Sequence, residues 1–534
     1  YESMFRFHES NADQAAQLAT GAHFVVVTGD HVEVAQTGIV HTAPAFGEDD
    51  FKARKQHGLG FLQMVGPDGK FLPGCTLVGG GSHPETPLVG RFCKDADRDI
   101  VRDLKDRGLL WKSEAYRHEY PFCPRADQDP LIQYARPGWF IRTTAVNASA
   151  LANNAAVAWH PENIGPGRFG DFLRNNVDWA LSRERFWGTP LNIWVCRDCQ
   201  VMSTPASVAE IEAQGGVLAE GVDRDLAVHK PWIDKVTLKC VCGGTMDRVP
   251  EVIDCWFDSG CMPFAQWGWP HQGKAEFARS FPADFISEAV DQTRGWFYSL
   301  LMTSTLLFDD ETCKAYGIEP RPFPRPYRNC IVLGHVCDAD GKKESKSKGN
   351  YTSPDLVLKG QMKVKVLPDP TLKPGQVGLK PPQVKSLGLD AAERMRTESG
   401  LLFEVVARPV KAKDTVHLHP DDAAPVGPVI VLIPPFPAPG ADAFRWLFCA
   451  SNPPWNNTRI SLKAILEGQR EFLFRLRNVH QFLVLNAGEW SPAAPVATHP
   501  LDRWLLHELD ALVRECTVQL DAYRPFEAAR AISA

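Results

Sequence analysis

The stretch DGKKESKSKGN, residues 340–350, decides how the rest of the chain is interpreted. It places four lysines and two serines on one predicted loop, which follows the apolar run Asn329–Gly334, a run typical of a strand. Such a loop can wrap a polyphosphate, because ammonium groups neutralise phosphate charge while hydroxyl and backbone N–H groups donate hydrogen bonds. Lysine runs also occur on ordinary solvated surfaces, so the composition of the loop favours both interpretations equally.

The residues around this loop alternate between apolar strand-like runs and helical runs. Over residues 251–350 this alternation predicts an α/β domain with a parallel sheet. The pattern changes at residues 359–440, where Pro and Gly punctuate short Val-rich runs and predict a small β-rich insert with a Pro-rich linker at its end. From Leu462 onward apolar residues recur at helical spacing, which predicts the start of a helical bundle.

The N-terminal region mixes short apolar runs with Gly-rich turns. His23–Val27 and Gly38–His41 are predicted to be strands, because both are rich in β-branched or aromatic residues. Asp97–Gly108 is predicted to be an amphipathic helix that Gly108 ends.

The overall composition excludes several classes of protein. The chain has 534 residues, 44% of them hydrophobic and 23% charged, which suits three or four domains of about 150 residues and rules out wholesale disorder. No apolar run approaches the roughly 20 residues that span a bilayer, so we expect no membrane protein. The net charge of −6 gives no overall basic footprint for nucleic acid, although a local basic surface is compatible with it. Because the first residue is Tyr1, we expect a fragment of a longer protein.

The cysteines suggest a metal site. Fourteen Cys in 534 residues are too sparse for a disulfide scaffold, and we expect a reduced, cytoplasmic protein. Two pairs have close spacing, C-x-x-C at Cys196 and Cys199 and C-x-C at Cys240 and Cys242. Four thiolates can complete a tetrahedral shell, so these residues predict a structural Zn²⁺ site; four unrelated thiols are the alternative.

The pentapeptide KESKS, Lys343–Ser347, resembles the KMSKS signature of class I aminoacyl-tRNA synthetases. Further stretches resemble the isoleucyl-tRNA synthetase family, while its valyl and leucyl relatives differ in the WFDSG and NPPWNNTR regions. These stretches are DWALSRERFWGTPL (178–191), PEVIDCWFDSGCMPFAQ (250–266), FPADFISEAVDQTRGWFYS (281–299) and SNPPWNNTRIS (451–461). The resemblance covers most of the chain except the insert at 359–440.

The resemblance implies a domain order within an α/β fold. The expected regions are the C-terminal part of a β-rich editing domain (1–112), the second half of a Rossmann-like catalytic domain (113–358) with a zinc knuckle (196–250), the insert (359–440), the end of the catalytic domain (441–461) and the start of an all-α anticodon-binding domain (462–534). The family's HIGH-type motif is absent from the sequence, and we expect it upstream of Tyr1 together with the rest of the catalytic fold.

The loop residues are implied to act on ATP. In the family the second Lys of the motif contacts ATP and stabilises the transition state in which pyrophosphate leaves. It corresponds to Lys346, with Lys343 as its catalytic partner and with Ser345 and Ser347 completing the ATP site.

One residue of the loop departs from the family pattern. Glu344 stands where the family usually has Met. A carboxylate there weakens the positive field unless Lys342 or Lys348 pairs with it, and we expect it to be exposed and tolerated.

A second group of residues is implied to hold the aminoacyl-adenylate. Glu288 matches the family's contact to that intermediate, and Asp291 and Gln292 match polar residues near the same pocket. Trp296 would line its apolar part. The alternatives are that Asp291 caps a helix and that Trp296 is simply core.

Two further pairs are implied to act on tRNA. Asp258 and Ser259 of WFDSG would orient the acceptor end of the tRNA. The stretch TGIVHTAPAFGEDD (37–50) resembles the editing signature, in which Asp50 would bind the ammonium of a mischarged amino acid and His41 would position the tRNA end and the hydrolytic water. A strand-end histidine without a catalytic role is the alternative for His41.

The resemblance therefore implies an isoleucine–tRNA ligase. Such an enzyme activates isoleucine with ATP and Mg²⁺, transfers it to tRNA(Ile) and hydrolyses valyl-tRNA; we expect a monomer, and no activation by residues 1–534 alone. Two alternatives stay open, namely valyl- or leucyl-type specificity on the same scaffold and a tRNA-binding paralogue without catalysis.

Overall fold

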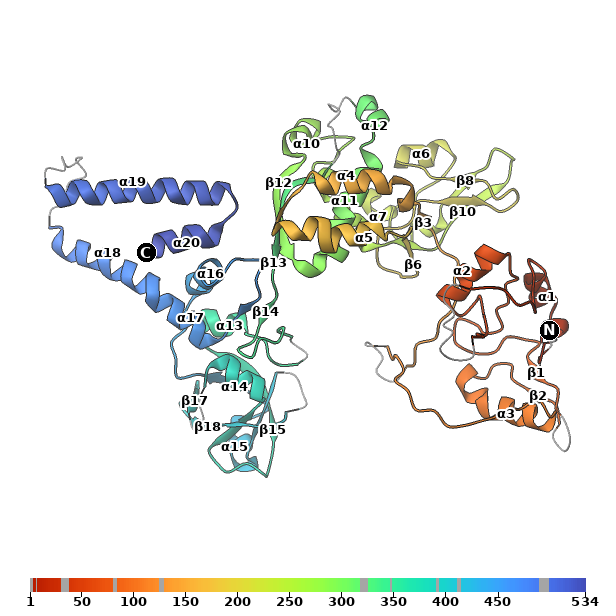
Figure 1. Cartoon of the computed structure of the whole chain (residues 1–534), viewed down its shortest axis with the longest axis horizontal. Coiled ribbons are helices and arrows are strands. Elements are labelled where there is room, and N and C mark those ends of the chain that lie inside the picture. Colours follow the sequence, from red (N-terminus) through yellow and green to blue (C-terminus); the bar gives the residue numbers. More distant parts are fainter. Residues whose placement is uncertain are drawn as a thin grey trace. The chain divides into compact units, whose positions relative to one another are not determined.

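The computed structural model describes ten segments of the chain, and the two compact units within it, Tyr1–Gly138 and Trp139–Ala534, are treated separately below (Figure 1). The described segments are residues 3–5, 7–29, 38–79, 84–123, 129–316, 325–345, 348–389, 393–410, 414–488 and 499–534. Among these residues, no helix combines the length and apolar character needed to cross a membrane.

The first unit is built from short helices and loops. Its named elements are α1 (Ala12–Leu18), α2 (Glu48–His57), β1 (Thr76–Leu77), β2 (Thr86–Pro87) and α3 (Asp97–Asp106). The predicted helix at 97–108 is confirmed as α3, which ends just before Gly108; that glycine has a φ of 71°, a left-handed conformation that favours glycine.

The two strands predicted near the start of the chain are wrong. Residues 23–27 and 38–41 form no strand, and β1 and β2 are the only named strands among the described residues of this unit. Val26 is 90% exposed and Ile39 81% exposed. β-branched residues favour strands when one face packs against a core, and here these side chains face solvent instead. The β-rich character expected for residues 1–112 is therefore not seen in the described part of this region.

The second unit contains a parallel three-stranded sheet, as the sequence predicts for an α/β domain. Its strands are β12 (Ala283–Ala289), β13 (Tyr327–Leu333) and β4 (Ala158–His160), in the order β12-β13-β4. Helices α4 (Asn147–Ala155), α5 (Gly170–Arg174) and α11 (Trp296–Leu307) pack on it through one apolar cluster that includes Leu173, Phe297 and Tyr327 (Figure 1). Burial of this cluster holds the sheet and its helices together.

A small antiparallel sheet carries the paired cysteines. Its strands are β7 (Trp194–Cys196), β8 (Met202–Ser203), β9 (Thr237–Lys239) and β10 (Thr245–Arg248), in the order β8-β7-β10-β9, with α6 (Val208–Ala213) and α7 (Arg224–Ala227) beside them.

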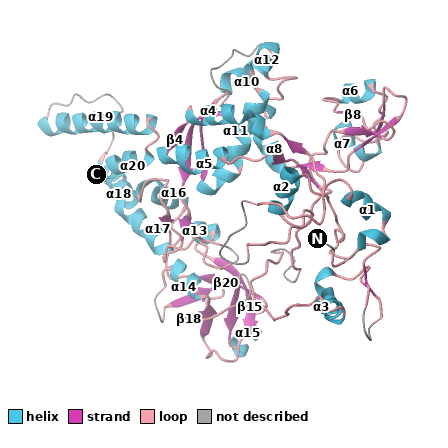
Figure 2. Ribbon diagram, turned by 45° about the vertical axis from the view of Figure 1, so that its right-hand side comes forward, coloured by secondary structure: helices cyan, strands magenta, loops and turns pink. Residues whose placement is uncertain are grey.

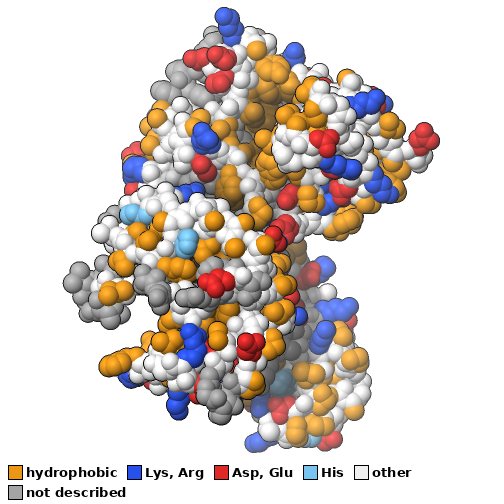
Figure 3. Space-filling model, turned by 90° about the vertical axis from the view of Figure 1, so that its right-hand side faces the viewer, with side chains coloured by type: hydrophobic (Ala, Val, Ile, Leu, Met, Phe, Trp, Pro, Cys, Tyr) orange, Lys and Arg blue, Asp and Glu red, His pale blue; other side chains and the backbone are white. Residues whose placement is uncertain are grey.

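The face of the molecule drawn in Figure 3 shows acidic and basic side chains interspersed, in keeping with the near balance of charge in the sequence.

The predicted β-rich insert is a closed six-stranded barrel. Its strands are β15 (Met362–Pro368), β16 (Gln376–Leu379), β17 (Arg394–Thr397), β18 (Leu402–Ala407), β19 (Thr415–Leu418) and β20 (Val429–Ile433), with α14 (Pro381–Leu387) and α15 (Pro420–Val426) (Figure 2). Met395, Val416 and Leu432 are fully buried inside it. Closure leaves no unpaired strand edge among these strands, so this segment forms a small core of its own.

The described part of residues 462–534 is helical, as predicted. It contains α17 (Leu462–Gly468), α18 (Phe474–Asn486), α19 (Pro500–Asp521) and α20 (Pro525–Ser533); α16 (Ala441–Ala450) precedes it, and α20 packs against both α16 and α19. The remaining short elements are β3 (Phe140–Ile141), β5 (Trp179–Ala180), β6 (Ser182–Arg183), β11 (Val252–Ile253), α8 (Cys255–Gly260), α9 (Met262–Ala265), α10 (Lys274–Ser280), α12 (Asp310–Ala315), β14 (Val336–Cys337), α13 (Pro354–Lys359) and β21 (Thr458–Arg459).

Candidate functional site

The carboxyl ends of β12 and β13 meet at one edge of the parallel sheet. Glu288 lies opposite Val332 in the register, and Ala289 lies opposite Leu333. The chain after each strand therefore emerges at the same place, which is where ligands bind in sheets of this kind. The segment after β12 carries Asp291 and Gln292, and the segment after β13 leads into the lysine-rich loop.

The segment after β12 is ordered by Gln292. Its Oε1 atom accepts a hydrogen bond from the backbone N–H of Trp296 at 3.0 Å, and its Nε2 group donates to Asp291 Oδ2 at 3.2 Å. The start of α11 is thus held by Gln292 and not by Asp291, the residue considered as a cap from the sequence. Glu288 and Asp291 are exposed at the same sheet edge. Their carboxylates are therefore accessible to a ligand.

Trp296 connects this segment to the WFDSG motif. Its Nε1–H donates to the backbone oxygen of Ser259 at 3.2 Å, and Trp296 is half-buried, so it is both packed and accessible. A Cβ on Gly260 would lie 2.8 Å from the Ser299 oxygen, which shows how closely α8 approaches α11. Partial desolvation, helped by the carboxylate of a neighbouring aspartate, raises the pKa of Asp258. The structure thus brings the WFDSG motif next to Trp296.

The lysine-rich loop is built around Asp338, which is almost fully buried. Its Oδ1 atom accepts backbone N–H groups of Asp340 at 3.0 Å and Lys342 at 2.9 Å, and the chain then returns so that Lys343 pairs with Cys337. The Lys343 side chain is exposed. Lys346 and Ser347 lie outside the described residues.

Asn350 closes the base of the loop. Its Nδ2 group donates to Asp338 Oδ2 at 2.8 Å, and its Oδ1 atom accepts the backbone N–H of Ser345 at 2.9 Å. Burial opposes ionisation of Asp338, but the hydrogen bonds from Asn350 and from the backbone of Lys342 keep its pKa below the ordinary value. Sequence reasoning missed both residues, although an Asp two positions before Asp-Gly is a typical turn signal.

Glu344 is half-buried, so the expectation that it is exposed is wrong. Its carboxylate accepts the hydroxyl of Thr352 at 2.9 Å and the backbone N–H of Thr352 at 3.2 Å. Desolvation raises the pKa of Glu344. The partner of this carboxylate in the described residues is therefore Thr352, eight positions on, and not Lys342 or Lys348. A pairing with a residue beyond the motif was not visible from the motif alone.

The NPPWNNTR stretch supports the strand that leads into the loop. The backbone N–H of Gly334 donates to the Pro454 oxygen at 2.9 Å, and that of His335 donates to Asn457 Oδ1 at 2.9 Å. Beyond these bonds, β21 runs parallel to β14, with Cys337 opposite Arg459. Two motifs that are far apart in the sequence therefore form one local structure.

The predicted editing residues lie in the first unit. Asp50 lies in the first turn of α2 and is half-buried, and its Oδ2 atom accepts the backbone N–H of Ala43 at 3.1 Å. A Cβ on Gly47 would lie 2.5 Å from the same oxygen, so this glycine lets the 43–47 segment fold over the carboxylate. His41 is exposed just before that segment.

The four paired cysteines come together, as their spacing predicts. The sulfur atoms of Cys196 and Cys242 are 3.6 Å apart, those of Cys199 and Cys240 are 3.5 Å apart, and all four lie within 4.8 Å of one another. A tetrahedral zinc with Zn–S bonds of about 2.3 Å places its sulfurs about 3.8 Å apart. The arrangement therefore fits a tetrahedral thiolate-bound metal ion.

The two residues after Cys242, Gly243 and Gly244, lie where a side chain would fit poorly. Gly243 has a φ of 89°, and a Cβ on Gly244 would lie 2.2 Å from the Asp198 carboxylate and 3.1 Å from the Cys196 sulfur. The backbone closes over the sulfurs only because no side chain is present there.

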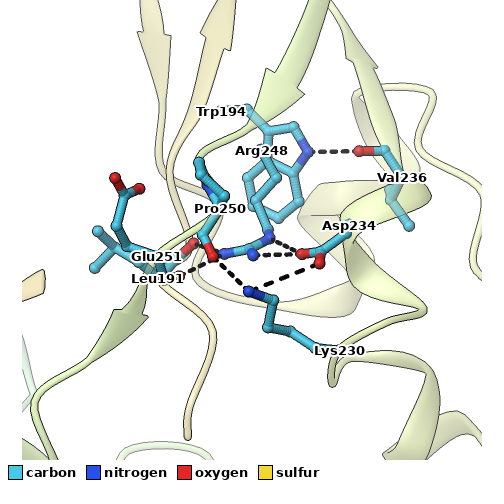
Figure 4. A network of polar contacts seen from close by, with 8 residues as sticks. All are labelled: Leu191, Trp194, Lys230, Asp234, Val236, Arg248, Pro250 and Glu251. Carbon is cyan, nitrogen blue, oxygen red and sulfur yellow. Dashed lines mark hydrogen bonds and ion pairs between the residues drawn. The ribbon is translucent and has the colours of Figure 1, made fainter. Parts of the chain in front are cut away.

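A buried arginine holds this small sheet together (Figure 4). The Arg248 side chain is fully buried; it forms an ion pair with Asp234 through a 3.0 Å Nε–H bond and a second N–H group, and donates to the backbone oxygens of Leu191 at 2.9 Å and Glu251 at 3.0 Å. Lys230 adds a 2.6 Å bond to a backbone oxygen just after β10. These contacts fix β10, and with it the turn that carries Cys240 and Cys242, against the rest of the small sheet.

The chain belongs to a known enzyme family. Residues 19–461 match the family described as tRNA synthetases class I (I, L, M and V). This match spans both described units and ends just after β21.

Curated proteins with sequences similar to this chain include isoleucine–tRNA ligases. The chain is 38% identical over 536 residues to an isoleucine–tRNA ligase of Clostridium novyi (strain NT), covering 99% of this chain and 40% of that protein. It is 37% identical to an isoleucine–tRNA ligase of Bacillus thuringiensis (strain Al Hakam), covering 97% of this chain and 40% of that protein. The chain thus spans about two-fifths of the length of the curated relatives it matches.

Replacement of Asp234 tests the role of the buried arginine. Asp234→Ala leaves a buried guanidinium without its carboxylate, so we expect the local stability of β10 to fall by about 3 kcal/mol. The matched control is Asp247→Ala, which breaks an exposed ion pair with Arg197 on the same sheet and should cost less than about 1 kcal/mol. Native-state amide exchange of residues 245–248 measures both, and equal losses in the two variants would refute the proposed difference.

Proposed function

We propose that this chain is part of an isoleucine–tRNA ligase, which activates isoleucine with ATP to isoleucyl-adenylate, transfers it to tRNA(Ile) and hydrolyses mischarged valyl-tRNA. One observation carries the proposal. The parallel strands β12 and β13 end at the same sheet edge, and the chain continues from them into the segment with Asp291 and toward the lysine-rich loop, in a chain that resembles isoleucine–tRNA ligases over 99% of its length.

ATP binds, in this proposal, with its phosphates toward the lysine-rich loop. Lys343 and Lys346 neutralise the charge that develops on the leaving pyrophosphate, while Ser345 and Ser347 donate hydrogen bonds to the phosphate oxygens. Mg²⁺ enters with ATP as part of the substrate. The isoleucine carboxylate attacks the α-phosphate in line; the bond from that phosphorus to its bridging oxygen breaks, and pyrophosphate leaves. The protein contributes position and charge stabilisation.

The amino acid binds at the end of β12. Glu288 is exposed at the sheet edge and holds the ammonium of isoleucine or a ribose hydroxyl, because a carboxylate accepts strong bonds from either group. Asp291 and Gln292 line the polar side, and the half-buried Trp296 forms the apolar wall for the aliphatic side chain.

Two further roles concern the tRNA. Asp258 and Ser259 orient the acceptor end beside the adenylate, which the hydrogen bond from Trp296 to the Ser259 backbone supports. In the first unit, Asp50 binds the ammonium of a wrongly attached amino acid and His41 positions the tRNA end and the hydrolytic water. Editing is needed because an apolar pocket rejects a substrate one methylene smaller by only about 1–3 kcal/mol, a magnitude for which isoleucyl-tRNA synthetase is the established example. The anticodon-binding role of residues 462–534, the monomeric state and the cytoplasmic location stay predictions.

Amino-acid-dependent exchange of pyrophosphate into ATP tests this function. On the complete gene product that contains these residues, we expect isoleucine to support exchange better than valine by roughly 10–200-fold, and leucine to support little. Lys343→Ala should lower kcat about 100-fold, a typical cost of removing one charge-stabilising donor. Lys373→Ala, on the exposed surface of the barrel, is the matched control and should leave kcat unchanged.

Two outcomes would contradict the proposal. Exchange with valine or leucine but not isoleucine would assign one of those specificities to the scaffold. No exchange with any amino acid would favour a tRNA-binding protein without catalysis.

We further propose that Cys196, Cys199, Cys240 and Cys242 hold a structural Zn²⁺. Sulfur is a preferred ligand of this ion, the sulfur separations suit a tetrahedron, and four protein ligands leave no position open for substrate. Hydrogen bonds from the backbone N–H groups of Cys199 and Asp198, and from the Cys242 thiol, lower the pKa of Cys196 to about 7 despite desolvation, which favours thiolate formation at the first ligand. When bound, the ion would cross-link the two cysteine turns.

Metal analysis tests this site directly. We expect about one zinc per chain, lost in Cys240→Ser together with the amide-exchange protection of β7 and β10, because metal binding is coupled to folding of such modules. Cys449→Ser, at an exposed cysteine on α16, is the matched control and should keep the zinc. Zinc content below about 0.1 per chain in the unmodified protein purified without chelator would exclude a site that binds as such modules do.

A further inference from the structure

The barrel contacts the base of the lysine-rich loop through its helix α14. The Lys385 ammonium lies 2.8 Å from both carboxylate oxygens of Asp340, the residue that opens the loop turn. Lys385 and Asp340 are 45 positions apart and belong to different substructures. The insert is therefore joined to the loop by a bidentate ion pair.

A second contact runs through buried hydroxyls. Thr352 Oγ1 and Ser386 Oγ are 3.1 Å apart and both residues are buried, while the same Thr352 hydroxyl donates to the Glu344 carboxylate. The hydrogen-bonded chain Ser386–Thr352–Glu344 thus leads from α14 into the KESKS sequence itself. It ends on Glu344, the one residue of the motif that departs from the family pattern.

The helix that makes both contacts is firmly held. Leu387 of α14 is buried in the barrel core, and Gly388, which ends the helix with a φ of 67°, approaches α17 so closely that a Cβ would lie 2.9 Å from the Cβ of Lys463. A Cβ on Gly349 would likewise lie 2.8 Å from the Lys380 side chain at the start of α14. Helix α14 is packed both against the barrel core and against α17. We therefore expect its contacts to restrain the loop, because the helix itself is held in place.

We propose that the barrel is a clamp that pre-organises the lysine-rich loop, with Lys385, Ser386 and Glu344 as positioning residues. A loop with several lysines is opposed by conformational entropy and by repulsion between like charges, and contacts to a rigid element offset both costs before ATP arrives. The clamp would order the loop whatever ligand binds there; its effect on ATP binding rests on the proposed function.

Reversing the charges of Lys385 and Asp340, singly and together, tests the ion pair in the 534-residue chain. Amide exchange of residues 338–345 should accelerate about two- to five-fold in Lys385→Asp and in Asp340→Lys, as expected for one exposed pair. The double variant Lys385→Asp/Asp340→Lys restores the pair and should return exchange to the original rate. Lys373→Ala, on the same barrel, should change nothing.

The hydroxyl chain is tested in the same way. Ser386→Ala removes one partner of a buried hydroxyl and should accelerate exchange of the same amides about five-fold. In Glu344→Gln the effect of Ser386→Ala should shrink, because the two residues act through Thr352. Exchange at the Lys373→Ala rate in all single variants, or a charge-swapped variant as fast as its parents, would overturn the clamp.

Kinetics separate the clamp from the proposed function. In the complete gene product, Lys385→Asp should lower kcat/KM for ATP several-fold, because the loop lysines act on the charge of the leaving pyrophosphate, and the charge-swapped variant should restore kcat/KM. An unchanged kcat/KM for ATP in Lys385→Asp would show that Lys385 does not pre-organise an ATP site. If no amino acid supports ATP exchange, the proposed function fails, while the amide-exchange result still decides whether the barrel restrains the loop.

Discussion

The parallel pairing of β12 with β13 is the constraint on which the rest of the site depends. Strands that run in the same direction deliver the chain to one edge of the sheet, and six residue pairs fix the register so that Glu288 lies beside Val332. A one-residue slip would turn the buried Ile286 away from the core cluster that α4, α5 and α11 share. The same strand pairing therefore also brings the end of β12, with Glu288, beside the end of β13, from which the chain continues toward the lysine-rich loop.

The described part of the loop is held by carboxylates and amides, and these contacts do not involve the Lys343 side chain. Asp338 and Asn350 organise the backbone, and Glu344 is occupied by Thr352, so the Lys343 side chain remains exposed at the surface. Asp338 is almost fully buried and Glu344 is half-buried, while Lys343 is exposed, so a chain with an overall charge of −6 still presents a basic side chain at this surface. Net charge alone therefore does not show which charges a local surface presents.

The sequence allowed much of the fold to be predicted where one local pattern dominates. Helix α3 followed from its spacing and from Gly108, and the cysteine cluster followed from two short spacings that are typical of metal knuckles. Closure of the insert into a barrel was not predictable, because it depends on pairing between strands such as β15 and β20 that are more than sixty residues apart. The strand predicted at residues 23–27 is likewise not formed. A strand needs a pairing partner, and local composition does not specify one.

In the candidate site too, the sequence predicted what a local motif marks and missed what depends on tertiary contacts. Glu288, Asp291, Gln292 and Trp296 were predicted from a motif; they lie at and just after the end of β12, and their role stays a prediction. Asp338 and Thr352 were missed because their importance comes from tertiary hydrogen bonds, and Glu344 was expected to be exposed because its partner lies outside the motif. Lys346 and Ser347 were predicted from the same motif and lie outside the described residues.

The central claim is that the end of β12 and the lysine-rich loop form one nucleotide site. Amide exchange of the complete gene product, with and without a non-hydrolysable ATP analogue in the presence of isoleucine, tests it most directly. We expect residues 288–296 and 338–345 to become protected together and with the same dependence on analogue concentration. Protection of only one segment at saturating analogue, or of neither, would contradict the claim.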